Sequence, residues 1–350
     1  MLAGFVEKVV SGPPSDPEWG NMLDEFRALG GVAENVMPGW RSSGRGLFPC
    51  DPTKPFLLRV PVNLRFPIGD IEFIEDTARI RKEAGAGPAE RQFFERYQET
   101  CSWIAGGRSE AAALISLFET LPLELRAKLA RDFTPQDLLE GTRRAGVQRQ
   151  FLRSRMIFWN NRQIFAPFVE LANRSAKGTP LRSDQQDNLV LEGKSADEIL
   201  VSYGPQDALG IFRRYGIPIA RPHSISLPMK VKVGNADLTI ARNLTMKAER
   251  GGFAIPVMTS TDGEISLSHL MIGNSNFQRA SRGIFYGLMR EAGVSGAEEA
   301  FDRILHFNRQ KFLQLLEALE PLNGELVRRL RMMAHFQLEA MTHCIGTREF

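Results

Sequence analysis

Three short segments of the chain hold residue types that can bind a small charged molecule and orient a nucleophile beside it. They are residues 44–48 (GRGLF), 165–175 (FAPFVELANRS) and 199–205 (ILVSYGP). Arg155 precedes the second segment, and Tyr215 follows the third. Glycines let a ligand approach the main chain, an amide and a guanidinium can bind its polar groups, and a tyrosine hydroxyl can orient a reacting atom. Each pattern alone is common, so their order along the chain is what points to one site.

Short strands, interrupted by a helical stretch, are predicted to position these segments. From about residue 70 to 153 the pattern is helical, and Thr134 before Pro135 predicts a capped helix start. Strands on both sides of this stretch predict one discontinuous, β-rich domain. The expected strands are short, apolar and bounded by Gly, Pro, Asn or Ser, and they lie at residues 55–62, 164–169, 189–192 and 199–203.

A second region follows Pro222. A hairpin is expected there, with strands at 229–233 and 237–241 joined by Gly234-Asn235. From about residue 296, apolar residues recur at spacings of three and four and predict two amphipathic helices, with a break at Pro321. We place the domain boundary near residue 224.

Composition limits the function classes. The 350 residues carry 44 basic and 41 acidic side chains, so the net charge of +3 gives no nucleic-acid signal. No run of 18 apolar residues predicts a membrane span, and the first residues lack the pattern of a secretory signal, so we expect a cytoplasmic chain that binds neither nucleic acid nor membrane. Cys50, Cys101 and Cys344 are odd in number and far apart, and the histidines form no HExxH motif, so we expect reduced thiols and no metal site.

In their order, the three segments resemble the SET-domain methyltransferases, and within them the Rubisco large-subunit methyltransferase group. The likeness covers about residues 20–345. It includes an opening helix at 19–29, an insertion segment at 138–142, the pair Ser154-Arg155, and residues 227–243 followed by two long helices.

This resemblance implies an α+β fold. A SET-type β-rich domain of short strands is expected at 20–224, with a helical insertion at about 70–153. A mainly α-helical, substrate-binding domain is expected at 225–350.

The resemblance also implies S-adenosylmethionine as cofactor. The Asn173 carboxamide would bind its amino-acid end and Arg155 its carboxylate, while the glycines would let it approach the main chain. The expected cofactor-binding residues are Gly44, Arg45, Gly46, Arg155, Glu170, Asn173, Arg174 and Tyr215.

For catalysis, the resemblance gives Tyr203 the role of orienting the attacking amine, and Tyr215 that of a wall of the target channel. A lysine amine has an ordinary pKa near 10.4 and must be neutral to attack, and a desolvating pocket beside a positive sulfur lowers that pKa. The expected function is protein-lysine N-methylation. The expected partner is a protein that presents a lysine, and the oligomeric state is not indicated.

Two positions depart from the family pattern. Arg174 stands where the family has histidine, and Asp207-Ala208 stands where Ser-Asn usually follows Tyr-Gly, so a polar anchor is expected to be missing there. A degenerate or repurposed SET-like binding protein therefore stays open as an alternative. Methylation of a histidine or of a small molecule is a further one.

Overall fold

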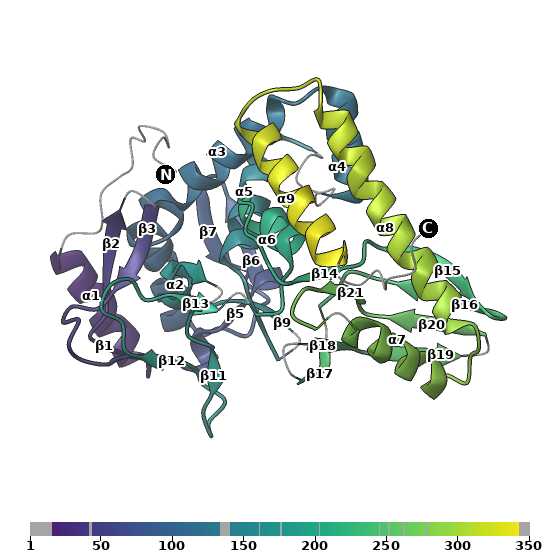
Figure 1. The fold of residues 1–350 in the computed structure, drawn as a ribbon. Helices are drawn as coiled ribbons and strands as arrows, with labels where there is room; N and C mark the ends of the chain where they lie inside the picture. Colours follow the sequence, from purple (N-terminus) through teal and green to yellow (C-terminus); the bar gives the residue numbers. More distant parts are fainter. Residues whose placement is uncertain are drawn as a thin grey trace. The chain divides into compact units, whose positions relative to one another are not determined.

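The computed structural model describes residues 16–41, 44–133, 141–160, 162–175, 177–202, 204–244, 246–250, 253–261, 263–277 and 279–342. Helices and short strands alternate in an α+β fold, as predicted (Figure 1). The chain divides into two compact units, the first formed by Met1–Ser116 and Glu140–Gly204 and the second by Leu117–Leu139 and Pro205–Phe350.

The first unit contains several small sheets. A four-stranded sheet has the order β1-β4-β12-β11, and β5, β9 and β8 form a three-stranded one. The pairs β2–β3 and β6–β7 are antiparallel, whereas β10 pairs with β13 in parallel. The strands are β1 Val32–Glu34, β2 Met37–Arg41, β3 Gly44–Phe48, β4 Phe56–Val60, β5 Phe66–Pro67, β6 Ile71–Ile74, β7 Thr77–Ile80, β8 Ile157–Trp159, β9 Arg162–Phe165, β10 Arg174–Ser175, β11 Arg182–Ser183, β12 Leu189–Gly193 and β13 Val201–Ser202.

The helices of the first unit form its aromatic core. They are α1 Asp16–Ala28, α2 Pro88–Thr100, α3 Arg108–Glu119, which crosses the division, and α5 Arg143–Arg155. Phe26 of α1 lies 4.8 Å from Phe168 and 6.1 Å from Phe93 of α2, measured between ring centroids. All three rings are buried, so this cluster fixes α1 and α2 against the segment that leads to Asn173.

The predicted helical stretch from residue 70 is wrong at its start. Ile71–Ile74 and Thr77–Ile80 form an antiparallel hairpin whose turn contains Glu75 with a φ of 54°. The β-branched residues and the alternating burial of Thr77–Ile80 favour strands, and this strand packs on α2. Within the predicted helical stretch, the first α-helix is α2, which begins at Pro88. The expected cap at Thr134 lies outside the described residues.

The second unit combines a strand-rich part with helices. Its helices are α4 Leu123–Asp132, α6 Ala208–Tyr215, α7 Ala280–Glu291, α8 Ala297–Leu319 and α9 Glu325–Thr342. Its strands are β14 His223–Ile225, β15 Met229–Val233, β16 Ala236–Ile240, β17 Met246–Arg250, β18 Phe253–Pro256, β19 Met258–Thr261, β20 Glu264–Leu267 and β21 Met271–Asn274. The predicted hairpin is confirmed as β15 and β16, which belong to a sheet of order β15-β16-β20-β19.

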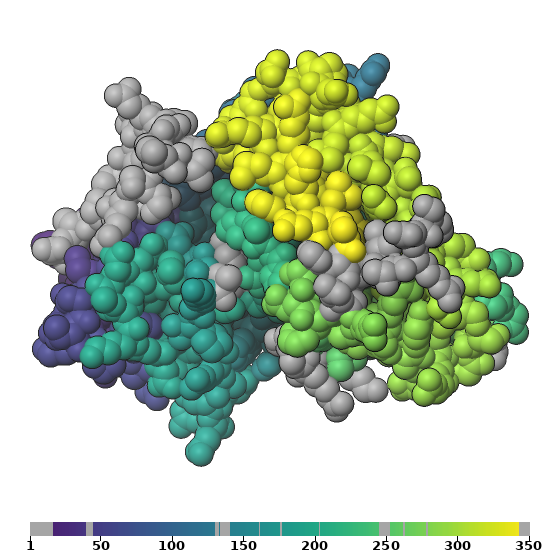
Figure 2. All heavy atoms as spheres, viewed as in Figure 1, coloured from purple at the N-terminus to yellow at the C-terminus, as the bar shows by residue number. Residues whose placement is uncertain are grey.

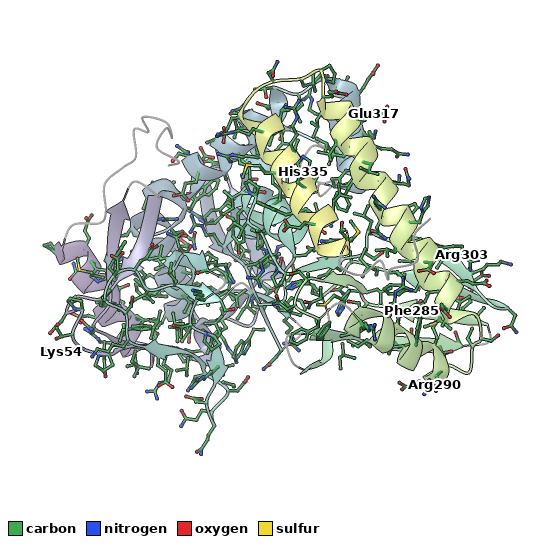
Figure 3. The ribbon with its side chains drawn as sticks, in the orientation of Figure 1. Lys54, Phe285, Arg290, Arg303, Glu317 and His335 are labelled. Atoms are coloured by element: carbon green, nitrogen blue, oxygen red, sulfur yellow. The ribbon has the colours of Figure 1, made fainter. Side chains whose placement is uncertain are left out.

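The two long C-terminal helices are confirmed as α8 and α9. They pack on each other, and Figure 2 shows their atoms side by side in yellow-green and yellow. Phe285 of α7, labelled in Figure 3, has its ring centroid 5.6 Å from that of Phe301 of α8. Asn308 of α8 is fully buried, accepts a hydrogen bond from the Leu227 N–H at 2.7 Å and donates to Ser226 Oγ at 3.0 Å, which ties α8 to the strand region.

The compact division falls at Gly204–Pro205, earlier in the chain than the boundary that we predicted near residue 224. Asp207, the N-cap of α6, is bonded within the second unit. Its carboxylate accepts hydrogen bonds from the N–H groups of Gly210 (2.8 Å) and Ile225 (2.9 Å) and forms an ion pair with Arg242. Arg329 of α9 also donates to the Gly216 carbonyl at 3.0 Å. These bonds join residues 205–224 to the second unit.

Candidate functional site

The three segments that the sequence singled out are hydrogen-bonded to one another in the first unit. Asn173 Nδ2 donates to the carbonyl of Arg45 at 2.7 Å. The N–H of Val201 donates to the Asn173 carbonyl at 2.9 Å, and the N–H of Ile199 donates to the Leu47 carbonyl at 2.7 Å. Residues separated by more than 120 positions in the sequence thus form one site.

The first segment is the strand β3. Gly44–Phe48 pairs with Met37–Arg41, with Gly46 opposite Gly39. The space beside Gly46 is occupied by a side chain, because a Cβ built there would lie 2.4 Å from Glu198 Oε1. The missing Cβ therefore admits the Glu198 carboxylate to the strand, and this carboxylate accepts a hydrogen bond from Asn173 Nδ2 at 2.6 Å.

The side chain of Arg45, on strand β3, belongs to a network of buried and partly buried charged groups. Arg45 donates from Nη1 to the carbonyls of Cys101 (2.7 Å) and Ser102 (3.2 Å), and its Nη2 lies 3.8 Å from Glu110 Oε2. Arg155 forms ion pairs with Glu110 and with Glu170, the latter at 3.3 Å. Two guanidinium groups and two carboxylates thus balance each other's charge.

Tyr97 completes this network from α2. Its hydroxyl donates to Glu170 Oε1 at 2.9 Å and accepts from the N–H of Phe168 at 2.9 Å. Phe168 is fully buried with a φ of 64°, a conformation that costs energy for a residue with a side chain. The Tyr97 hydroxyl therefore helps to hold the strained backbone just before Asn173.

Burial dominates the electrostatics of this cluster. Desolvation, and then the charge of Arg155, lowers the pKa of Arg45. Desolvation, and then the Glu170 carboxylate, raises the pKa of Tyr97 far above its usual value and that of the Cys101 thiol to about 12. Tyr97 and Cys101 thus stay protonated at neutral pH, and Cys101 is a buried free thiol, not a nucleophile.

The other predicted site residues do not all lie in one part of the chain's structure. Glu170 and Arg155 belong to the buried network, and Arg174 is half-buried, with Nη2 donating to the Met156 carbonyl at 3.3 Å. Tyr215 is the half-buried last residue of α6 in the second unit. Tyr203 lies outside the described residues, so its role stays a prediction.

Four further contributors to this site were not predicted from the sequence: Tyr97, Glu110, Glu198 and Gly178. A Cβ added to Gly178 would lie 2.3 Å from the carbonyl carbon and oxygen of Val201. Next to it, Thr179 donates to the Leu200 carbonyl at 2.7 Å and accepts from the Ser202 N–H at 3.0 Å. Gly178 thus lets the chain approach the strand that leads to Tyr203. A glycine in an unremarkable KGTP stretch gives no local signal for this.

We expect Gly178→Ala to lower the free energy of unfolding by about 1–3 kcal/mol, the usual cost of forcing an extra group into a packed site. The added methyl group meets main-chain atoms, which cannot rotate away. Denaturant unfolding measures the effect. Gly69→Ala is the matched control, because a Cβ there has no neighbour within 4 Å. Equal midpoints for the two variants would show that the close approach is not required.

Among the described residues, no group of three or more His, Cys, Asp and Glu side chains could hold a metal ion. In the same part of the chain, no helix is both long enough and apolar enough to cross a membrane. Cys344 lies beyond the described residues.

No protein-family model and no curated protein matches this chain. Among solved structures, the chain is similar to the SET domain of LSMT bound to lysine and AdoHcy, with a TM-score of 0.40 and 12% identity. It is also similar to Rubisco LSMT bound to AdoMet (TM-score 0.39, 12% identity) and to Rubisco LSMT bound to sinefungin and monomethyllysine (0.40, 13%). Each likeness covers 95% of this chain and 91% of the other. Likenesses of this strength establish neither a family nor an activity.

Proposed function

We propose that this chain is an S-adenosylmethionine-dependent protein methyltransferase of the SET type, and that its target is a lysine. One observation carries the proposal: the three segments that resemble the family's motifs converge through hydrogen bonds. Asn173 is bonded to Arg45 and to Val201, and Ile199 is bonded to Leu47. If the three short motifs resembled the family by chance, they would not be expected to lie next to one another in the structure.

The residues at this site fit the amino-acid end of the cofactor. Arg45 is buried, and its Nε and Nη2 form no hydrogen bond with the described part of the chain. A buried guanidinium with unused donors suits a carboxylate. Asn173 uses its amide nitrogen within the protein, which leaves its oxygen for an ammonium group.

Arg155 differs from the expectation that it pairs directly with the cofactor's carboxylate. Its guanidinium already contacts Glu110 and Glu170 and donates to the Glu170 carbonyl at 3.1 Å. We propose that Arg155 organises the network and that Arg45 contributes spare donors. Glu170, whose side chain is fully buried between Arg155 and Tyr97, would act by holding the backbone before Asn173.

When bound, S-adenosylmethionine supplies an electrophilic methyl group on a positively charged sulfur. The chain's task is mainly alignment, since a positioned nucleophile gains a large effective concentration. Tyr203 would orient the neutral lysine amine through its hydroxyl, and Tyr215 would line the channel for the target side chain. Water can remove the proton of the amine, so no histidine or cysteine base is needed.

Two observations bear on the alternative, a SET-like binding protein without activity. Arg174 replaces the family's histidine, and its backbone pairs with Val201 in the parallel β10–β13 ladder. Asp207 stands in place of the family's Ser and caps α6, whereas Ala208 has no polar side chain in place of the family's Asn. The active enzyme and the binding module would share these local features, so a methyl-transfer assay has to distinguish them.

Asn173→Ala is expected to weaken binding of S-adenosylhomocysteine by about tenfold or more, since a hydrogen bond to a charged group contributes roughly 1.5–3 kcal/mol. Calorimetric titration measures this. Asn276→Ala, a change on an exposed residue of the second unit, is the matched control and should bind like the wild type. Unchanged affinity in Asn173→Ala would remove Asn173 from the cofactor site.

A further inference from the structure

The orientation of the Asn173 carboxamide is fixed by its neighbours. Nδ2 lies 2.7 Å from the Arg45 carbonyl oxygen and 2.6 Å from Glu198 Oε1. A carbonyl oxygen and an ionised carboxylate accept hydrogen bonds and cannot donate. Both amide protons are therefore used within the protein, and a flipped carboxamide would face two acceptors with its own oxygen.

Within the described part of the chain, the amide oxygen is therefore the side-chain atom that Asn173 can still offer to a ligand. None of the residues that the structure describes donates a hydrogen bond to Asn173 Oδ1. An acceptor at this place selects a ligand that donates, such as an ammonium group. Without Glu198, one amide proton would lose its acceptor, and the carboxamide could rotate to present a donor.

The chain makes room for this carboxylate at a specific position. A Cβ on Gly46 would lie 2.4 Å from Glu198 Oε1 and 3.1 Å from its carboxyl carbon. The peptide group that follows Glu198 is held at both of its polar atoms, because Ser195 Oγ donates to the Glu198 carbonyl at 2.8 Å and the Ile199 N–H donates to the Leu47 carbonyl at 2.7 Å. Glycine at 46 and glutamate at 198 thus act as a pair.

We propose that Glu198 is a positioning residue. It holds the Asn173 carboxamide with its oxygen toward the ligand and thereby makes the site selective for a ligand that carries an amine. This selectivity rests on the proposed cofactor site. The Glu198–Asn173 pair itself can be tested without any ligand.

The ligand-free test follows solvent exchange of the Asn173 side-chain amide protons by nuclear magnetic resonance, with Asn173→Asp used to assign them. Glu198→Ala should speed this exchange by about tenfold, since the bond to a charged acceptor is lost. Gly46→Ala should do the same, because its methyl group displaces the carboxylate without removing the charge. Glu198→Gln keeps an acceptor oxygen and should remain near the wild type. Equal exchange in the wild type and in both alanine variants would overturn the proposal.

The second test compares S-adenosylhomocysteine with the analogue that lacks its amino group, by calorimetric titration. Glu198→Ala should weaken binding of S-adenosylhomocysteine by about tenfold and leave the deaminated analogue unaffected. Equal losses for both ligands would mark Glu198 as merely structural and overturn the positioning role. If the wild type binds neither ligand, the proposed function fails and the predicted amine selectivity falls with it. In that case the exchange measurement decides whether Glu198 orients Asn173.

Discussion

Asp207→Ala is expected to lower the free energy of unfolding of the second unit by about 3–5 kcal/mol, the cost of breaking a buried ion pair by removing one partner. The Asp207 side chain is completely buried and the Arg242 side chain is 7% exposed. Arg242 also donates to the carbonyls of Ile225 and Ser226, so it would stay in place with its charge uncompensated. The same change removes the N-cap of α6. Denaturant unfolding followed by circular dichroism measures the loss.

The pH dependence of stability provides a second readout. Burial alone raises the pKa of Asp207, but the Arg242 guanidinium and the two N–H donors outweigh it, so the folded-state pKa lies below the ordinary value. The stabilisation is therefore present above the unfolded-state pKa near 3.9 and is lost as the pH falls through the lower, folded-state pKa. Asp207→Asn should reduce this acid dependence.

Asp237→Ala is the matched control, because Asp237 is exposed on β16. It should change stability by no more than about 0.5 kcal/mol, as surface substitutions usually do. An Asp207→Ala variant as stable as this control would show that the buried pair contributes nothing net to folding.

Tyr203→Phe is expected to lower methyl-transfer turnover by about a hundredfold, the scale of a positioned polar group that acts mainly in the transition state. The neighbouring backbone is well fixed, with the Ser202 N–H bonded to Thr179 at 3.0 Å and the Gly204 N–H bonded to Ser202 Oγ at 3.1 Å. The fold and most of the cofactor affinity should therefore survive. Single-turnover kinetics and calorimetric titration of the same preparation separate the two effects.

Tyr286→Phe serves as the control for the removal of a hydroxyl group. Tyr286 lies on α7 in the second unit and accepts a hydrogen bond from Arg282, so its change should leave turnover intact. If Tyr203→Phe lost as much cofactor affinity as turnover, Tyr203 would be a packing residue. Unchanged turnover would assign the catalytic role elsewhere, with Tyr215 as the next candidate.

Local patterns predicted the parts of this structure that depend on local physics. Gly234-Asn235 between two alternating segments predicted the β15–β16 hairpin, and the three-and-four spacing of apolar residues predicted α8. The motif segments were recognised by their order, and the bond between Asn173 and the Arg45 carbonyl unites two of them. These features follow from turn chemistry, helix periodicity and motif order, which a sequence displays directly.

The parts that escaped prediction depend on tertiary contacts. Glu110 looks like an ordinary residue in the first turn of α3, yet it contacts Arg45 and Arg155. Glu198 precedes a strand in a polar segment, and only the approach of Gly46 reveals its partner. The hairpin at residues 71–80 is stabilised by packing on α2. The local sequence does not show this tertiary contact, and the segment was therefore predicted to begin a helical stretch.

The proposed activity of this chain is methyl transfer from S-adenosylmethionine to a protein lysine. The most direct test incubates the purified chain with a protein extract and S-adenosylmethionine that carries a trideuterated methyl group, and locates the label by peptide mass spectrometry. The predicted result is labelled lysine with the wild type and a strongly reduced signal with Asn173→Ala and Tyr203→Phe. Absence of any labelled residue, together with no binding of the cofactor by the wild type, would contradict the claim. Label on histidine alone would support S-adenosylmethionine as the cofactor but contradict lysine as the methylated residue.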